Sequence, residues 1–245
     1  MKIILFSDIH ANLPALEAFF ADVDGRTYDA IYCLGDLVGY NVWPNEVIAE
    51  IRRRRIPTIA GNHDIKVKKL KVDQHLNEEE AKVNYAYHLG TAQSRAYLRS
   101  LPAHLKIEYK FTDEQLNVML VHGSNRSVNE YMLQDLDESY VNELLDECQS
   151  HILCCGHTHK PYHRVIARNE QYRHVINIGA VGKPKDGDPR GCYVILTIDE
   201  ASTLADPASV KVEFIRFEYD VEKAAKAVED CPLPDEFAER LRKAY

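Results

Sequence analysis

The sequence of 245 residues lacks the features of several large protein classes. No apolar run approaches the roughly 20 residues that a membrane-spanning helix needs, so we expect no membrane insertion. The first apolar segment meets Asp8 too early for a signal peptide, and no small-residue cleavage site follows it. The six cysteines contain no C-x-x-C pair, which favours reduced core thiols over a disulfide framework. These absences predict a cytoplasmic protein.

The sequence also has no excess of positive charge. Thirty Lys and Arg residues stand against 38 Asp and Glu residues, for a formal net charge of −8. This balance makes nucleic acid an unexpected partner, because nonspecific binding to phosphates needs many cations. It leaves room for a local positive site, which a bound metal ion could supply. With 45% hydrophobic residues, we expect a single domain over residues 1–245.

Short apolar runs alternate with helix-like segments in the first part of the chain. The runs that read as strands are 2–6, 29–36 and 56–64, and the helices between them are 12–23 and 44–55. This alternation predicts parallel strands joined by right-handed crossovers. Residues 66–101 look helical throughout, with an interruption at Gly90.

Strands dominate the rest of the sequence. The segments 104–111 and 115–123 look like a hairpin with a turn at Thr112–Glu114. The elements expected after it are a helix at 138–148, strands at 151–157, 162–167, 173–179, 191–198 and 210–217, and helices at 220–230 and 234–245. We expect the later strands to pair in antiparallel fashion. The whole pattern predicts an α/β fold.

Polar side chains of one chemical type stand where several predicted strands end. They are Asp8 and His10, Asp36, the run Asn62, His63 and Asp64, then His122, and finally His157 and His159. Because the carboxyl ends of strands in an open α/β sheet form the ligand-binding crevice, we expect these groups to converge. Residues i and i+2 of an extended strand share a face, so His157 and His159 are expected to turn toward one site.

Carboxylate, imidazole and amide oxygen are ligands for Mn²⁺, Fe²⁺, Ni²⁺ or Zn²⁺. The number of candidate ligands exceeds what one tetrahedral zinc requires. It suits two divalent ions about 3.5–4 Å apart that share one carboxylate. We expect Mn²⁺ first, with iron, nickel and zinc as alternatives.

The motifs D-x-H, GD, GNHD, VHG and GHTH occur in this order between Asp8 and His159. Their order resembles the calcineurin-like metallophosphoesterase superfamily. The flanking segments "FSDIHANLPALEA" and "NIGAVGKPKDGDPRGCY" resemble its small bacterial and archaeal predicted phosphodiesterases. The resemblance implies a four-layer αββα sandwich, in which two mixed β-sheets are flanked by helices.

The resemblance also implies a ligand role for seven motif residues. The first metal would be bound by Asp8, His10 and His159, the second by Asn62, His122 and His157, and both by a bridging Asp36. His63 would face the substrate and protonate the leaving-group oxygen. For Asp64 two interpretations stay open, because it either orients His63 or is a solvated or helix-capping carboxylate.

Four further residues are candidate substrate contacts. Tyr40 follows the GD motif and is either a stacking residue of the pocket or a packing residue. Lys183 and Arg190 lie in a loop rich in glycine and cations, which could hold an anion. Arg126 follows the VHG motif and is a similar candidate. The alternative for these three cations is an ordinary surface turn.

The sequence departs from two other branches of the superfamily. Protein Ser/Thr phosphatases and diadenosine tetraphosphatases carry an Asp-Arg-Gly triplet after GD, and Glu after GNH. Here Gly39, Tyr40 and Asn41 stand in place of the triplet, and Asp64 stands in place of the Glu. The Asp that orients the histidine in those enzymes, and their phosphate-holding Arg, are therefore missing.

The resulting hypothesis is an enzyme that uses two metal ions and activated water to hydrolyse small phosphodiesters. Cyclic nucleotides and nucleotide-like esters are candidate substrates, and phosphomonoesters are a second class. The alternatives are a nuclease and a non-catalytic, metal-binding scaffold. A nuclease would be expected to have a basic groove, which the net charge of −8 does not favour.

Overall fold

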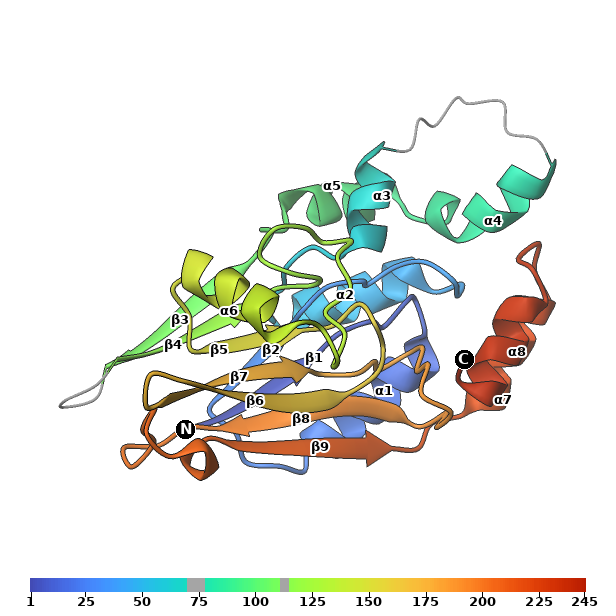
Figure 1. Ribbon diagram of the computed structural model, residues 1–245. Coiled ribbons are helices and arrows are strands. Elements are labelled where there is room, and N and C mark those ends of the chain that lie inside the picture. The colour runs from blue at the N-terminus through green and yellow to red at the C-terminus, as the bar shows by residue number, and fades with distance from the viewer. Residues whose placement is uncertain (70–77, 111–114) are drawn as a thin grey trace.

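The computed structural model describes residues 1–69, 78–110 and 115–245 (Figure 1). Two mixed β-sheets form its centre. The four-stranded sheet has the order β2-β1-β8-β9, with β1 at Lys2–Phe6, β2 at Ala30–Cys33, β8 at Gly191–Thr197 and β9 at Lys211–Phe217. The five-stranded sheet has the order β3-β4-β5-β7-β6, with β3 at Leu105–Lys110, β4 at Gln115–Leu120, β5 at Ile152–Cys155, β6 at Tyr162–Arg168 and β7 at Gln171–Asn177.

Helices surround the two sheets (Figure 1). They are α1 (Leu13–Val23), α2 (Pro44–Arg53), α3 (Asn62–Lys69), α4 (Glu78–His88), α5 (Ala92–Ser100), α6 (Glu138–Glu147), α7 (Val221–Glu229), α8 (Glu236–Lys243) and the 3₁₀ turn η1 (Pro207–Ser209). Across the described ranges, every helix is too short or too polar to cross a lipid bilayer.

Three apolar layers hold the sandwich together. Between the sheets, Leu5 of β1 belongs to the same fully buried cluster as Leu120 of β4. On the outer face of the four-stranded sheet, Phe19 of α1 packs on Phe6 with ring centroids 4.4 Å apart. On the outer face of the other sheet, Leu144 of α6 is buried in a third cluster. The predicted four-layer αββα sandwich is therefore confirmed.

Strand directions follow the expected pattern. β1 and β2 are parallel and are connected through α1, and β4 and β5 are parallel and are connected through α6. β5 and β7 are parallel as well, with β6 between them in the chain. β3 and β4 form the predicted antiparallel hairpin, and its predicted turn at Thr112–Glu114 lies outside the described residues. β6 pairs with β7 and β8 with β9 in antiparallel fashion. The parallel strands place their carboxyl ends at one edge, where the polar motifs follow them.

Two local predictions were wrong. Residues 56–64 form no strand, because Pro57 lacks an N–H and the segment makes only one bridge, between Cys33 and Thr58. The end of this segment instead begins α3 at Asn62. The helical stretch predicted for 66–101 is divided into α3, α4 and α5, and its part at 70–77 lies outside the described residues.

The cysteines behave as the sequence predicted. Cys33, Cys154, Cys155 and Cys192 are buried, and all six cysteines are free thiols. The four buried cysteines pack in strands as small apolar side chains, so they contribute to the core without a covalent cross-link.

Candidate metal centre

The loops that leave four strands bring the motif residues together. Asp8 follows β1, Asp36 follows β2, His122 follows β4, and His157 and His159 follow β5. The backbone N–H of Asp8 donates to Gly35, and that of Gly156 donates to His122, so loops from both sheets are tied in pairs. The site therefore lies where the two sheets meet at the carboxyl ends of their parallel strands.

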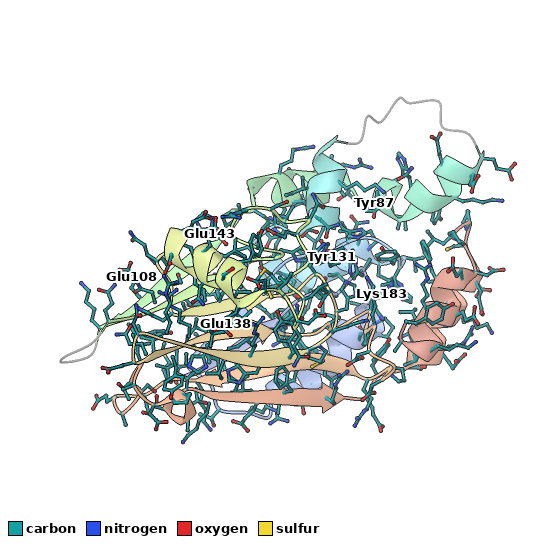
Figure 2. The ribbon with its side chains drawn as sticks, viewed as in Figure 1. Tyr87, Glu108, Tyr131, Glu138, Glu143 and Lys183 are labelled. Atoms are coloured by element: carbon teal, nitrogen blue, oxygen red, sulfur yellow. The ribbon has the colours of Figure 1, made fainter. Side chains whose placement is uncertain are left out.

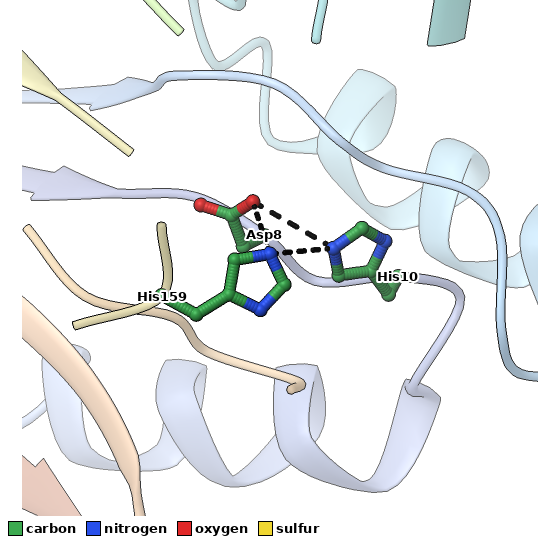
Figure 3. A group of neighbouring side chains, drawn as sticks. All are labelled: Asp8, His10 and His159. Atoms are coloured by element: carbon green, nitrogen blue, oxygen red, sulfur yellow. Dashed lines mark hydrogen bonds and ion pairs between the residues drawn. The ribbon is translucent and has the colours of Figure 1, made fainter. Parts of the chain in front are cut away.

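One group of ligand atoms surrounds Asp8 (Figure 3). The Asp8 Oδ1 atom lies 3.1 Å from His159 Nε2 and 3.6 Å from His10 Nε2. The two Nε2 atoms are 3.2 Å apart. All three side chains are buried. Three ligand atoms thus point at one small volume, as a metal site requires.

A second group surrounds Asp36. The Asp36 Oδ2 atom lies 3.3 Å from His122 Nε2, which is 3.0 Å from the amide oxygen of Asn62. A ligand atom of His157 lies within 4.8 Å of those of Asp36 and His122. Asp36 Oδ2 is also 3.6 Å from His10 Nε2 of the first group. Asp36 is therefore placed between the two groups.

The residues converge by a different route from the predicted one. Five of the candidate ligands adopt left-handed backbone conformations, with φ of 55° at Asp8, 51° at His10, 55° at Asp36, 65° at His157 and 59° at His159. The i, i+2 argument for an extended strand was wrong, because β1 and β5 end before these residues. Left-handed residues other than glycine are uncommon and cluster at functional sites, where the surrounding hydrogen bonds hold them.

Close backbone packing explains the glycine of the GNHD motif. A Cβ atom added to Gly61 would lie 2.1 Å from Asp36 Oδ1, a distance that real Cβ atoms do not reach. Without that side chain, the start of α3 approaches Asp36, and the backbone N–H of His63 donates to Asp36 Oδ1 at 2.8 Å. The carboxylate is thereby stabilised by a helix N-terminus.

The tautomer of three histidines follows from their outer hydrogen bonds. In each the Nδ1 atom meets a backbone carbonyl: Val38 for His10, Leu34 for His122 and Lys183 for His159. A carbonyl oxygen can only accept, so Nδ1 carries a proton, and in the neutral ring the Nε2 lone pair faces the centre. Metal-binding histidines use this arrangement to fix the ring and its tautomer.

Unpaired buried atoms provide a test of whether a cation fits. Asp8 Oδ1, Asp36 Oδ2 and His157 Nε2 are buried and have no hydrogen-bond partner among the described residues. Buried polar atoms are nearly always paired, so a set of unpaired acceptors around one point indicates a missing partner. All three can donate a lone pair to a cation. The cluster could therefore bind divalent metal ions.

The electrostatics of the cluster agree with this geometry. Burial acts to raise the pKa of Asp36, but His122 and His63 hold that pKa well below its usual range. Burial acts in the opposite sense on His122, yet the charge of Asp36 raises the pKa of His122 to about 10. Without metal, positive charge is thus drawn to the place where a cation would bind.

His63 lies beside the two groups of ligand atoms. Its Nε2 atom is 4.0 Å from Asp36 Oδ2, and its side chain remains 14% exposed. Its ring centroid lies 4.8 Å from those of His10 and Tyr40. Burial lowers the pKa of His63 to about 3. It is therefore the least buried imidazole of this neighbourhood that still contacts the cluster, as a residue facing a substrate would be.

The structure decides between the two interpretations of Asp64. Its carboxylate is fully buried and accepts hydrogen bonds from the backbone N–H groups of Asp36, Leu37 and Gly61 at 2.8, 3.0 and 2.9 Å. The bond from Gly61 is the reach-back contact of a helix cap. Asp64 therefore joins the GD loop to the start of α3 and does not bond the ring of His63.

The four candidate substrate contacts divide into two kinds. Tyr40 contacts the cluster, and Lys183 Nζ lies 4.5 Å from the centre of the Tyr40 ring. Arg126 is instead ion-paired with two carboxylates of α6, and Arg190 with Asp188. Neither arginine offers an unpaired charge to an anion, because these exposed pairs already hold the guanidinium groups.

Two residues at the site were missed by the sequence analysis. The Tyr87 hydroxyl of α4 hydrogen-bonds His63 Nδ1. Tyr131 is 53% exposed and stacks on the ring of His157, with centroids 4.3 Å apart. Neither stands in a motif, and the helical periodicity around Tyr87 indicates only a packed helix face. No signal in the sequence alone points to either contact.

Known proteins are similar to this chain in sequence and in fold. The calcineurin-like phosphoesterase superfamily domain matches residues 1–201. The uncharacterized protein MJ0912 of Methanocaldococcus jannaschii is 30% identical over 251 residues, covering 98% of this chain and 96% of that protein. The crystal structure of a metallophosphoesterase from Sphaerobacter thermophilus is 30% identical with a TM-score of 0.77, covering 100% of this chain and 99% of that one.

A second solved structure supports the fold alone. The hypothetical protein PH1004 of Pyrococcus horikoshii has a TM-score of 0.79 at 22% identity, with 100% of this chain and 98% of that one covered. The domain match spans most of the sequence and includes every motif from Asp8 to His159. The chain therefore belongs to the calcineurin-like phosphoesterase superfamily.

Proposed function

We propose that this protein hydrolyses small phosphodiesters with two divalent cations, one in each group of ligand atoms. The observation that carries the proposal is the position of Asp36 Oδ2, a buried atom with no hydrogen-bond partner among the described residues. It lies 3.6 Å from a ligand atom of the first group and 3.3 Å from one of the second. A single carboxylate oxygen between two ligand sets suits a dinuclear site.

The seven ligand residues are those implied by the resemblance: Asp8, His10 and His159, then Asn62, His122 and His157, with Asp36 between them. When bound, the cations would lower the pKa of water to about 7 and neutralise charge on the phosphoryl oxygens. We propose Mn²⁺ as the metal, because oxygen and imidazole ligands without thiolate suit it.

The remaining roles belong to residues beside the cluster. His63 faces the leaving-group oxygen and donates to it. Lys183 contacts a phosphoryl oxygen, since its side chain is only 1% exposed and its Nζ atom has no hydrogen-bond partner among the described residues. A buried unpaired amine is costly without an anion, and burial lowers the pKa of Lys183 to about 7.

A hollow next to the GHTH loop suits the organic part of a small ester. It has a volume of about 410 Å³ and is lined by Leu133, Thr158 and Lys160, among others. That size is within the range of small-molecule pockets, roughly 300–1,000 Å³. The hollow combines apolar side chains with the cation of Lys160 and the carboxylate of Asp135, and its volume would admit the organic part of a small ester.

The test is turnover by the Mn²⁺-loaded protein. We expect hydrolysis of bis-p-nitrophenyl phosphate, loss of that activity with a chelator, and a fall of roughly 10²–10⁴-fold in His63→Ala. A panel of cyclic nucleotides, p-nitrophenyl phosphate and single-stranded DNA is run beside it. Two bound metals with no turnover of any ester would instead indicate a scaffold, and degradation of DNA would indicate a nuclease.

Lys183 has a test of its own. Lys183→Met keeps the length of the side chain and removes its charge, so we expect KM for the diester to rise about tenfold with little change in kcat. Lys106→Met on β3 is the matched control, because Lys106 is ion-paired with Glu108 on the same strand. Equal KM values in both variants would remove Lys183 from the substrate site.

A further inference from the structure

The ring of His63 has a partner that no motif of the sequence contains. Tyr87 lies on α4, 24 residues after His63, and its hydroxyl hydrogen-bonds His63 Nδ1. The two rings are nearly parallel, with an interplanar angle of 17° and centroids 5.8 Å apart. Figure 2 labels Tyr87 where α3 and α4 come close together. A helix that provides no candidate metal ligand thus reaches the proposed site.

The direction of this hydrogen bond follows from burial. Tyr87 is only 5% exposed, and among the described residues its hydroxyl has one hydrogen-bond partner, His63 Nδ1. A buried O–H group needs an acceptor, so with a neutral ring the hydroxyl donates and Nδ1 accepts. Burial also raises the pKa of Tyr87 well above its usual range, so the phenol keeps its proton. Nδ1 then holds a lone pair, and the ring proton of His63 is on Nε2.

This tautomer is the opposite of that found in the neighbouring histidines. In His10, His122 and His159 the Nδ1–H group donates to a carbonyl, which leaves the lone pair of the neutral ring on Nε2. In His63 the Nε2–H group faces the centre. A lone pair binds a cation, whereas an N–H group repels a cation and donates to a substrate oxygen. The group that bonds to Nδ1 therefore distinguishes the proposed metal ligands from His63, the proposed hydrogen-bond donor.

A glycine beside His63 and Tyr87 makes their contact sterically possible. Gly39 has a φ of +95°, and a Cβ atom added there would lie 2.7 Å from His63 Nδ1 and 3.3 Å from the Tyr87 hydroxyl. Gly39 stands where the Asp-Arg-Gly triplet begins in the phosphatases named above. Gly39 thus has no side chain that could orient the histidine, and a side chain at this position would collide with the contact between Tyr87 and His63.

Other contacts hold Tyr87 in place. Its ring belongs to the buried cluster that contains α1 and α2, and Lys66 Nζ lies 4.3 Å from the ring centre. The His63 side is fixed as well, because its backbone N–H is bonded to Asp36 and its ring contacts Tyr40. Both partners are therefore constrained before a substrate binds.

We propose that Tyr87 is the positioning residue of His63, and that its hydroxyl holds the ring as the Nε2–H tautomer directed at the leaving-group oxygen. The donation from His63 to the leaving-group oxygen rests on the proposed function, whereas the tautomer of His63 does not. The phenol serves both forms of the ring, since it donates to Nδ1 of the neutral ring and can accept from Nδ1–H of the imidazolium. A carboxylate could only accept.

The first experiment reads the tautomer directly. Nuclear magnetic resonance of protein with isotope-labelled histidine, free of metal and loaded with Zn²⁺, should show the ring proton of His63 on Nε2. The signal is identified by its absence in His63→Gln. In Tyr87→Phe, which removes only the hydroxyl, we expect a mixture of tautomers. In Tyr85→Phe on the same helix we expect the wild-type spectrum.

The second experiment reads the consequence for turnover of the Mn²⁺-loaded protein. Diphenyl phosphate releases a poorer leaving group than bis-p-nitrophenyl phosphate and depends more on a donor. Tyr87→Phe should lower kcat about tenfold or more on diphenyl phosphate, and less on the nitrophenyl ester, at unchanged KM. Tyr85→Phe should leave both rates unchanged.

Two results would overturn the proposal. One is a wild-type His63 that carries its proton on Nδ1. The other is a Tyr87→Phe protein with the wild-type tautomer, whatever its activity. A loss of activity in that protein would then be a structural defect, which slows both esters alike. If the wild-type enzyme hydrolyses neither ester, the proposed function fails, but the spectrum still decides the role of Tyr87.

Discussion

Histidines lie close together in two regions of this molecule with different surroundings. At the candidate metal centre, His10, His122 and His159 face the carboxylates of Asp8 and Asp36. In the five-stranded sheet, His163 Nε2 of β6 lies 2.9 Å from His174 Nδ1 of β7, with the rings stacked. His174 is 1% exposed, as deeply buried as the histidines of the centre. Burial alone therefore does not distinguish the regions.

The difference lies in the carboxylates and the backbone. The histidines of the pair are in regular strands, bond each other, and belong to no group of ligand atoms among the described residues. The candidate ligands of the centre, apart from Asn62 at the start of α3, lie in loops, several with left-handed φ, and acceptors among them are unpaired within the described residues. An imidazole becomes a candidate ligand when the backbone directs its lone pair at a carboxylate that also lacks a partner.

The largest expected effect comes from removing the shared carboxylate. Asp36→Asn should lower turnover of the diester by about 10³-fold and reduce the bound metal, because both groups of ligand atoms lose a charged oxygen. His174→Gln should change turnover by less than about twofold. Elemental analysis and steady-state kinetics measure both effects. Full activity in Asp36→Asn would refute its bridging position.

The pair of His163 and His174 should affect how the stability of the protein depends on pH. Burial lowers the pKa of His174 from its ordinary 6.5 to about 4, so between these values the unfolded chain binds more protons. The contribution of His174 to the free energy of unfolding is complete above pH 6.5. As the pH falls toward 4, the free energy of unfolding decreases by roughly 3 kcal/mol, at about 1.36 kcal/mol per pKa unit.

Denaturant unfolding across that range, compared with His174→Gln, isolates this effect from other groups. The wild-type free energy of unfolding should fall more steeply with acidification than that of the variant. Parallel curves for the two proteins would show that His174 titrates normally in the fold.

Metal should stabilise the centre and leave the pair unaffected. At a free metal concentration of about 100 times Kd, the free energy of unfolding should rise by about 2.7 kcal/mol. His174→Gln should keep this increase, and Asp36→Asn should lose most of it. Thermal melts with and without Mn²⁺ measure the difference. An equal increase in all three proteins would place the metal elsewhere.

The smallest effect is expected at Arg126. It follows the VHG motif, but its guanidinium group is ion-paired with Glu143 and Glu147 on the surface of α6. Exposed pairs contribute roughly 0–1 kcal/mol to stability, so Arg126→Ala should leave the fold intact. Because Glu143 and Glu147 already occupy the guanidinium group, the variant should change kcat/KM by less than about twofold. A tenfold loss would restore the substrate contact that the sequence analysis predicted for it.

Particular elements show why prediction succeeded or failed. The apolar runs of β1, β4, β5 and β8 are recognisable because strands buried on both faces are continuously apolar. The segment 56–64 has a similar run, yet it is not a strand, because Pro57 lacks an N–H and the segment forms a single bridge. Pairing with a neighbouring strand is a tertiary property that a local pattern does not contain.

The same limit applies to the site. Each motif residue is recognisable by its neighbours in the chain, whereas Tyr87 reaches His63 only because α4 packs beside α3 and Gly39 leaves room. Arg126 could not be assigned for the same reason, since its carboxylate partners lie on α6. Arg190 pairs with Asp188, two residues earlier in the chain, so its partner depends on the local conformation of the loop.

By itself the sequence determined the kinds of ligand atoms, their order, and the alternation of strands and helices that brings strand ends together. Those properties are local, because residue type and periodicity act over a few neighbours. Only the tertiary structure decided which Nδ1 atoms bond to carbonyls, how near Asp36 lies to both groups of ligand atoms, and which tyrosine bonds to His63. These depend on distances between segments far apart in the chain, and hydrogen bonding falls off within a few tenths of an ångström.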